Sequence, residues 1–281
     1  MKFISFLNRG TPSYGTVSDN KVLDLGCGYG SGYSTLRAWI AAGLDKPKQE
    51  SKPKFDSLAL DDITLLPPII DPQKIICVGL NYKAHAVEGG FKIPDFPTVF
   101  MRTTSTLVAH LCPLQRPRRS TDFDYEGELA VIIGKPGRHI RVSDALDHVF
   151  GYTCFNDGSV RDIQFQHSLI AGKNFPGTGA MGPWIVTSDE IPDPSKLILT
   201  TKVNGYEVQH KGIDDMIFSV AQIISYISSW TQLEAGDVIA TGTPEGVGFA
   251  RKPPLWLKLG DTVDVEISGI GRLTNPVGVE P

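Results

Sequence analysis

The sequence predicts a β-rich α+β fold, with a small N-terminal α+β domain over residues 1–70 and a larger domain over residues 71–281. Many short apolar runs are separated by turns that contain Gly or Pro, which is typical of strands. Patterns with helical spacing are few, and strands do not alternate with helices as a doubly wound sheet requires. Residues 65–72 include three prolines, which favours an extended linker between the two domains.

The N-terminal domain combines three short strands with one helix. The strands are predicted at 2–7, 15–17 and 21–25, with turns between them. Residues 34–42 have helical spacing, and Gly43 ends that helix. Residues 45–53 are polar and rich in Lys and Pro, so we expect an exposed loop there.

The larger domain opens with a buried strand at 74–79. Further strands are predicted at 98–101, 106–108, 128–133, 149–155, 183–187, 197–203, 237–241 and 262–267. A short helix is expected at 143–147. A longer helix over 214–230 begins at Asp214 and Asp215 and carries apolar residues on one face.

Composition narrows the class of protein. A hydrophobic share of 41% and a charged share of 21% are ordinary for a globular protein. The formal net charge of −4 argues against nucleic-acid and anionic-membrane binders. No apolar stretch approaches the roughly 20 residues that span a bilayer, and the N-terminus is too weakly apolar for a signal peptide. The four cysteines include no CxxC pair, so we expect reduced thiols in a cytoplasmic protein.

Glu126 and Glu128 stand at the start of an apolar run that predicts a strand buried on both faces. Side chains two residues apart share one face of a strand, with roughly 6–7 Å between their Cα atoms. Asp157 follows a second apolar run, 149–155. Three carboxylates at strand ends, without Cys or His beside them, favour Mg²⁺ or Mn²⁺ over Zn²⁺. For Glu126 and Glu128 alone, a solvated strand end is the alternative.

His85 and Glu88 stand three residues apart, which places them side by side on one helical turn. A carboxylate partner orients an imidazole and stabilises its charged form, so the pair can take a proton from water near neutral pH. From this segment alone, a surface His–Glu pair on a short helix is the better explanation of the spacing.

Residues 22–30, Val-Leu-Asp-Leu-Gly-Cys-Gly-Tyr-Gly, resemble the first motif of S-adenosylmethionine-dependent methyltransferases. A strand, a glycine-rich turn and a helix would let the backbone approach a cofactor. That fold also needs a second strand ending in an acid about 20 residues later. Residues 45–53 contain no apolar strand, so a methyltransferase is only a distant alternative.

Five segments occur in the order seen in the fumarylacetoacetate hydrolase family, which the chain resembles over about residues 65–281. They are 79–88, 124–134, 155–164, 172–175 and 241–248. The resemblance implies a mixed β-sandwich or β-roll core, homodimers, and one Mg²⁺ or Mn²⁺ per subunit held by Glu126, Glu128 and Asp157. It also implies catalytic roles for His85, Glu88 and Lys173, and substrate contacts for Tyr82, Arg161, Gln164 and Thr243.

Two departures from the family pattern stand out. The archetypal member has an extra acidic metal ligand where this chain has residues 79–82, so we expect three protein ligands. Arg102 stands where members commonly carry a lysine, which keeps the charge and changes its geometry.

The resemblance implies a metal-dependent enzyme acting on a small 2-oxo carboxylate. We expect hydrolysis of a C–C bond in a 2,4-dioxo, acylpyruvate-type acid, because His85 and Glu88 suit water activation. Decarboxylation of an oxaloacetate-like acid, or enol–keto isomerisation on the same site, is the alternative.

Overall fold

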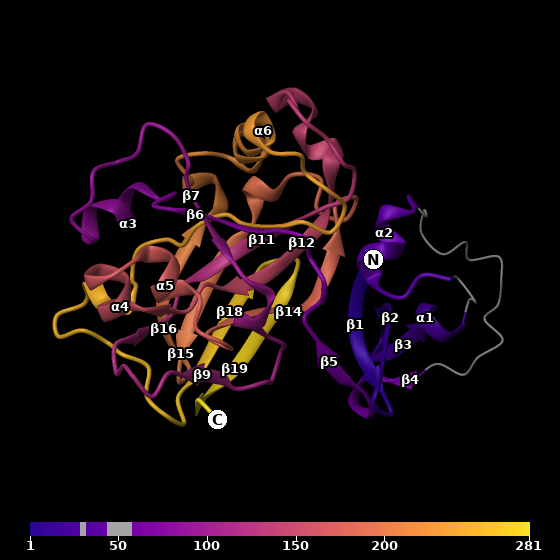
Figure 1. The fold of residues 1–281 in the computed structure, drawn as a ribbon, viewed down its shortest axis with the longest axis horizontal. Helices are drawn as coiled ribbons and strands as arrows, with labels where there is room; N and C mark the ends of the chain where they lie inside the picture. Colours follow the sequence, from indigo (N-terminus) through magenta and orange to yellow (C-terminus); the bar gives the residue numbers. More distant parts are fainter. Residues whose placement is uncertain (29–31, 44–57) are drawn as a thin grey trace.

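The computed structural model describes residues 1–28, 32–43 and 58–281, and it confirms a β-rich α+β fold (Figure 1). Most of the strands join one twelve-stranded sheet. Its main path runs through β4 (Leu58–Ala59), β3 (Lys21–Asp24), β2 (Thr11–Ser18), β1 (Lys2–Asn8), β14 (Gly179–Thr187), β12 (Val149–Asn156), β11 (Gly127–Ile133), β17 (Val238–Ala240), β6 (Ile75–Gly79) and β7 (Thr98–Arg102). Two short strands join it from the side, β5 (Thr64–Leu66) on β1 and β8 (Leu107–Val108) on β14.

A second sheet of five strands packs against this one. Its order is β16 (Tyr206–Gly212), β15 (Ile198–Val203), β18 (Thr262–Ile267), β19 (Gly271–Val279) and β9 (Leu114–Arg116). The short strands β10 (Phe123–Asp124) and β13 (Ser159–Val160) pair with each other. Leu199, Val265 and Leu273 of the five-stranded sheet share one apolar core with strands β11 and β12 of the large sheet.

Strand β11 is buried on both faces, as its continuous apolar run predicts. Leu129, Val131 and Ile133 face the core shared with the second sheet. Ala130 and Ile132 face a different core, toward the N-terminal part of the chain. This period-two alternation is the pattern of a central strand, so the carboxylates at its start are held on rigid backbone.

The N-terminal strands extend the large sheet, because β1 pairs with β14 in an antiparallel register that joins Phe3 to Ile185. Figure 1 shows this part (indigo) beside the rest of the molecule, with helices α1 (Leu25–Gly28) and α2 (Leu36–Ala41). Thr35 caps α2 by accepting a hydrogen bond from the Ala38 N–H. The sheet therefore runs across the domain boundary expected near residue 70, and that boundary stays a prediction.

The methyltransferase-like stretch coincides with β3 and α1. Strand β3 pairs antiparallel with both β2 and β4, whereas the nucleotide-binding fold needs parallel strands. Residues 29–30 of the motif and the loop expected at 45–53 lie outside the described residues.

Helices of the larger domain are short and lie at the ends of strands. They are α3 (Lys83–Glu88), α4 (Arg161–Gln166), α5 (Leu169–Lys173) and α6 (Val220–Trp230), with 3₁₀ turns η2 (Thr104–Thr106), η3 (Val142–His148), η4 (Pro194–Lys196), η5 (Ile213–Asp215) and η6 (Gly248–Ala250). The 3₁₀ turn η1 (Leu60–Asp62) lies before residue 71. Among the described residues, no helix is long and apolar enough to cross a membrane.

Two helix predictions need correction. The long helix begins later than Asp214, because Ser219 caps α6 in a reciprocal capping box with Gln222. Asp214 and Asp215 belong instead to the separate turn η5. The helix expected at 143–147 is the 3₁₀ turn η3.

Candidate active site

Strands β11 and β12 bring the three predicted metal ligands together. Glu126 stands just before β11, Glu128 lies on it, and Asp157 directly follows β12. Gly127 pairs with Asn156 in the antiparallel register, and the Asp157 N–H donates to the Glu126 carbonyl oxygen at 2.8 Å. One carboxylate oxygen from each ligand lies within 4.8 Å of the others, and all three residues are buried.

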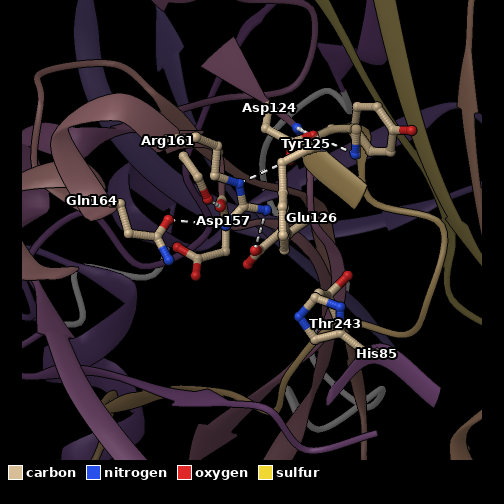
Figure 2. Close-up of polar contacts among 12 residues, drawn as sticks. His85, Asp124, Tyr125, Glu126, Asp157, Arg161, Gln164 and Thr243 are labelled. Atoms are coloured by element: carbon tan, nitrogen blue, oxygen red, sulfur yellow. Dashed lines mark hydrogen bonds and ion pairs between the residues drawn. The ribbon is translucent and has the colours of Figure 1, made fainter. Parts of the chain in front are cut away.

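Three buried cations surround these carboxylates. The Lys173 ammonium donates to Glu126 Oε2 and to Asp157 Oδ2, each at 2.6 Å. Arg161 Nη2 donates to Glu126 Oε1 at 2.6 Å (Figure 2). Arg102 donates to Asp157 Oδ1 and, at 3.0 Å, to the Gly158 carbonyl oxygen. Arg102 therefore keeps a cation against the triad, at the position where the family commonly has lysine.

Glu126 and Glu128 have opposite electrostatic environments. Burial raises the pKa of Glu126, but Lys173 and Arg161 outweigh it and lower that pKa to about 2. The pKa of Glu128 is raised well above its usual value by burial, and then by Asp157 and Glu126. Among the described residues no cation forms an ion pair with Glu128, which accepts a hydrogen bond from the Gly242 N–H at 2.9 Å.

This donor set fits a hard divalent cation. Its ligand atoms are carboxylate oxygens, which Mg²⁺ and Mn²⁺ prefer. Glu128 is a buried carboxylate that a cation would neutralise, because the three buried cations contact its neighbours instead. No fourth acidic residue joins the group among the described residues.

His85 and Glu88 form the expected pair on α3. His85 Nδ1 lies 2.9 Å from Glu88 Oε1, and His85 is buried. The Gly246 N–H donates to both carboxylate oxygens of Glu88, at 3.0 and 2.9 Å. Because the carboxylate accepts, Nδ1 carries the hydrogen and Nε2 is left as the ring's exchangeable nitrogen.

Arg161, the first residue of α4, contacts several side chains through its guanidinium group. Its Nε donates to Asp124 Oδ2 at 2.8 Å and its Nη1 to Gln164 Oε1 at 2.9 Å (Figure 2). The ring of Phe249 lies 4.5 Å from the guanidinium carbon. Since the amide oxygen of Gln164 faces Arg161, its NH₂ group is the part that can serve a ligand. Arg161 is thus structural and also lines the cavity.

Thr243 lies on the glycine-rich loop after β17, and its hydroxyl is already used inside the protein. It donates to the Gly127 carbonyl oxygen at 2.9 Å and accepts from Gln209 Nε2 at 2.8 Å. Gln209 Oε1 also accepts from the Gly127 N–H at 3.0 Å. A hydrogen bond from this hydroxyl to a substrate would have to replace the one to Gly127.

Tyr82 is not brought together with the other predicted residues. It is buried at the start of α3, and its hydroxyl has no hydrogen-bond partner. Burial, followed by the charges of Glu128 and Asp215, raises its pKa. Tyr82 lines a separate hollow on the far side of α3, next to Lys211 and Glu245.

A cavity of about 230 Å³ joins eight of the predicted residues, whereas Glu88 contacts His85 but does not line the cavity itself. His85, Glu126, Glu128, Asp157, Arg161, Gln164, Lys173 and Thr243 all line it. Its other walls are mostly apolar and include Val78, Leu80, Phe91, Phe100, Phe165, Leu169 and Phe249. A small anion in this cavity would therefore meet cations and the His85 imidazole, with apolar side chains around the rest of it.

Sequence reasoning missed several residues that shape this cavity. Asp124 is buried and accepts from Arg161 and from the N–H groups of Gly248 and Phe249. The alternation that singles out Glu126 and Glu128 extends back to Asp124, so it carried a usable signal. No sequence pattern pointed to Gln209, because its contacts depend on the pairing of strands that are distant in sequence.

Comparisons with known proteins point in one direction. A family model described as "Fumarylacetoacetate (FAA) hydrolase C-terminal" matches residues 74–278. An oxaloacetate tautomerase of Bacillus subtilis (strain 168) is 44% identical over 244 residues, covering 85% of this chain and 80% of that protein. A mitochondrial oxaloacetate tautomerase of Xenopus laevis is 40% identical over 249 residues, covering 86% and 78%.

Solved structures agree with this fold over the whole chain. A fumarylacetoacetate hydrolase from Exiguobacterium antarcticum superposes with a TM-score of 0.86 at 36% identity, covering 100% of both chains. A 2-hydroxyhepta-2,4-diene-1,7-dioate isomerase from Mycobacterium marinum gives 0.79 at 31% identity, covering 100% of this chain and 99% of that one.

Proposed function

Because the chain belongs to the fumarylacetoacetate hydrolase family, we propose that it is a divalent-metal-dependent tautomerase. It would interconvert the enol and keto forms of a small 2-oxo acid of the oxaloacetate type. The observation that carries the proposal is one cavity lined by a buried carboxylate triad and by His85, whose Nδ1 contacts Glu88. The names of the relatives that match over most of the chain support this chemistry.

Glu126, Glu128 and Asp157 would hold the cation, for which Mg²⁺ and Mn²⁺ are the candidates. When bound, the cation supplies Lewis acidity that favours the charged oxygen of an enolate. The predicted discrimination against Zn²⁺ rests on the same all-oxygen donor set.

The chain's own residues would orient the substrate and move its protons. Tautomerisation removes a proton from the enol oxygen and adds one to the carbon of the C=C bond that does not bear this oxygen, while C=C becomes C–C and C–O becomes C=O. His85 Nε2 can accept or deliver a proton, since Glu88 holds the opposite ring nitrogen. The Lys173 ammonium would stabilise negative charge on the substrate oxygen through its own charge, since its three hydrogens already have acceptors.

Arg161 and Gln164, which line the cavity beside Phe249, would orient the substrate's carboxylate. Their mutual hydrogen bond fixes the Gln164 amide, so a ligand need not order it. Phe249 packs edge-on against both His85 and Phe165, with ring centroids 6.5 and 5.3 Å apart. These contacts restrict the imidazole and keep water from the enolate.

Hydrolysis of an acylpyruvate, the main expectation from the sequence, remains a second candidate. The His85–Glu88 pair can take a proton from water as readily as from an enol. The names of the relatives favour isomerisation over hydrolysis, however, and isomerisation needs no attacking water.

The test is to follow loss of enol absorbance from freshly dissolved enol-oxaloacetate, with purified protein and Mg²⁺ or Mn²⁺. Metal without protein is the control, because metal ions alone speed the exchange. Parallel assays measure pyruvate release from oxaloacetate and cleavage of acylpyruvates. We expect tautomerisation to be the fastest of the three reactions. Cleavage of acylpyruvates without any acceleration of tautomerisation would overturn the proposal.

We also propose that the protein assembles as a homodimer and is located in the cytoplasm. Light scattering on the purified protein tests the first. Fractionation of the source cells tests the second.

A further inference from the structure

We propose that Lys173 is a built-in counter-cation of the carboxylate triad, which keeps the metal-free site assembled and weakens its affinity for the divalent cation. The inference rests on the proposed metal site. It assigns Lys173 a role that precedes substrate binding, and that role can be measured without any turnover.

All three hydrogens of the Lys173 ammonium have an acceptor among the triad. Nζ lies 2.6 Å from Glu126 Oε2, 2.6 Å from Asp157 Oδ2 and 3.1 Å from the Asp157 carbonyl oxygen. An ammonium has three donors, so Lys173 is saturated by two residues that would also ligate the metal. Its nitrogen therefore stands between two carboxylates that would otherwise repel each other.

The lysine is held in this place by its surroundings. It ends helix α5, which Ser168 caps by accepting from the Ala171 N–H. A side chain at Gly172 would come within 2.6 Å of Gln164, so α5 packs closely on α4. The Lys173 ammonium lies 5.5 Å from the ring centre of Phe100, and the side chain is almost fully buried. Its position is thus fixed before any ligand binds.

The charges of the buried cluster nearly balance without a metal. Among the described residues, its carboxylates are Asp124, Glu126, Glu128 and Asp157, and its cations are Arg102, Arg161 and Lys173. Four negative charges against three positive leave a formal charge of −1. Of the three cations, Lys173 alone contacts two of the proposed ligands.

Two opposite effects follow from this arrangement. Without metal, the ammonium offsets repulsion between Glu126 and Asp157, so its loss should destabilise the metal-free protein. With metal, ammonium and dication share the same two carboxylates at short range and repel each other. Loss of the ammonium should therefore tighten divalent-cation binding.

The experiment is calorimetric titration of Mn²⁺ into metal-stripped, full-length protein. The variants are Lys173→Met, which keeps length without charge, and Lys173→Gln, which is neutral but can still donate. Lys211→Met is the matched control, because Lys211 also bridges two carboxylates, Asp215 and Glu245, at 3.2 and 2.9 Å outside the cavity. Thermal melts of every protein with and without Mn²⁺ accompany the titrations.

We expect both Lys173 variants to bind Mn²⁺ about tenfold more tightly or better, with Lys211→Met equal to wild type. The metal-free melting temperature should fall in the Lys173 variants, and Mn²⁺ should raise it more than in wild type. A variant that folds only with Mn²⁺ supports the proposal too. Equal or weaker Mn²⁺ binding by both Lys173 variants overturns it.

Failure of the metal site itself gives a different result. If wild type binds no Mn²⁺ but the Lys173 variants do, metal dependence of the native enzyme is wrong and the role of Lys173 stands. If none of the proteins binds Mn²⁺, both proposals are overturned.

Discussion

Neutralising the two glutamates of β11 should change the stability of the metal-free protein in opposite directions. Glu126 is ionised against Lys173 and Arg161, so its charge stabilises the fold. Glu128 is buried without an ion-pair partner among the described residues, so its ionisation opposes folding. Glu126→Gln should therefore destabilise the metal-free protein, and Glu128→Gln should stabilise it. The residues are two positions apart and both are buried, so each is the control for the other.

The size of the first effect follows from the pKa of Glu126. A fall from the ordinary 4.5 to about 2 corresponds to about 3 kcal/mol of stability at neutral pH. For a protein of this size, that is a loss of roughly 6–12 °C in melting temperature. For Glu128→Gln the direction alone is predicted, a rise in melting temperature. The amide oxygen introduced by that substitution could still accept from the Gly242 N–H.

The pH dependence has a sign that can be checked. The folded pKa of Glu126 is depressed, so its stabilisation is present above about pH 4.5 and is lost as pH falls toward 2. The pKa of Glu128 in the folded protein is raised, so its ionisation lowers the stability of the fold as pH rises above 4.5. Both variants should therefore approach wild-type stability in acid.

Thermal and urea denaturation in EDTA, at pH 7 and below pH 4.5, measure these differences. Mn²⁺ should then raise the melting temperature of wild type, by mass action on the folded state, and should raise that of either variant much less. Equal losses of stability from the two substitutions at pH 7 would refute the electrostatic reasoning.

Four further outcomes are expected. EDTA should abolish turnover and Mg²⁺ or Mn²⁺ restore it; full activity in metal-stripped protein would contradict the metal requirement. His85→Ala should lower kcat for tautomerisation by roughly 10²–10⁴ while calorimetric Mn²⁺ affinity is unchanged, since the imidazole moves a proton and is no ligand. Tyr82→Phe should leave kcat and KM unchanged and should not lower the melting temperature, because the hydroxyl is buried without a partner; a large loss of activity would restore its predicted substrate role. Gly246→Ala should lower kcat, because the backbone at Gly246 has a φ of +102° and an added Cβ would clash with the Val208 carbonyl oxygen. The clash would displace the Gly246 N–H, which donates to the Glu88 carboxylate. Unchanged kinetics would show that this hydrogen bond is dispensable.

The local sequence pattern was sufficient to predict features that lie within a single strand or helix. The continuous apolar run after Glu128 predicted a doubly buried strand, and β11 has that burial. The three-residue spacing of His85 and Glu88 predicted their contact, and they meet on α3 at 2.9 Å. Both inferences rest on the periods of strand and helix, which sequence alone sets.

The boundaries of strands and helices, and the shortest helices, were harder to predict from the sequence. Strand β16 alternates poorly and is half exposed, and it is stabilised by pairing with β15 across the turn at Asn204 and Gly205. Helices α4 and α5 span six and five residues, too few for a helical period to appear in the sequence. Tyr82 directly precedes helix α3 in sequence, yet it lines a separate hollow and not the cavity that His85 lines.

The sequence by itself determined the β-rich class, the pairing of Glu126 with Glu128 and that of His85 with Glu88, because each depends on residue patterns within single strands or helical turns. That Asp157 joins the two glutamates depends on the pairing of β11 with β12. Tertiary structure alone decided how these groups are charged. Lys173, Arg161 and Arg102 come from α5, α4 and β7, and they meet Glu126 and Asp157 only after the sheet has formed. Glu128 differs from Glu126, two residues away, because no cation in the described part of the chain forms an ion pair with it. The energy of a charge–charge interaction depends on the distance between the charges in space and not on their separation in sequence. These interactions are therefore determined only once the chain has folded.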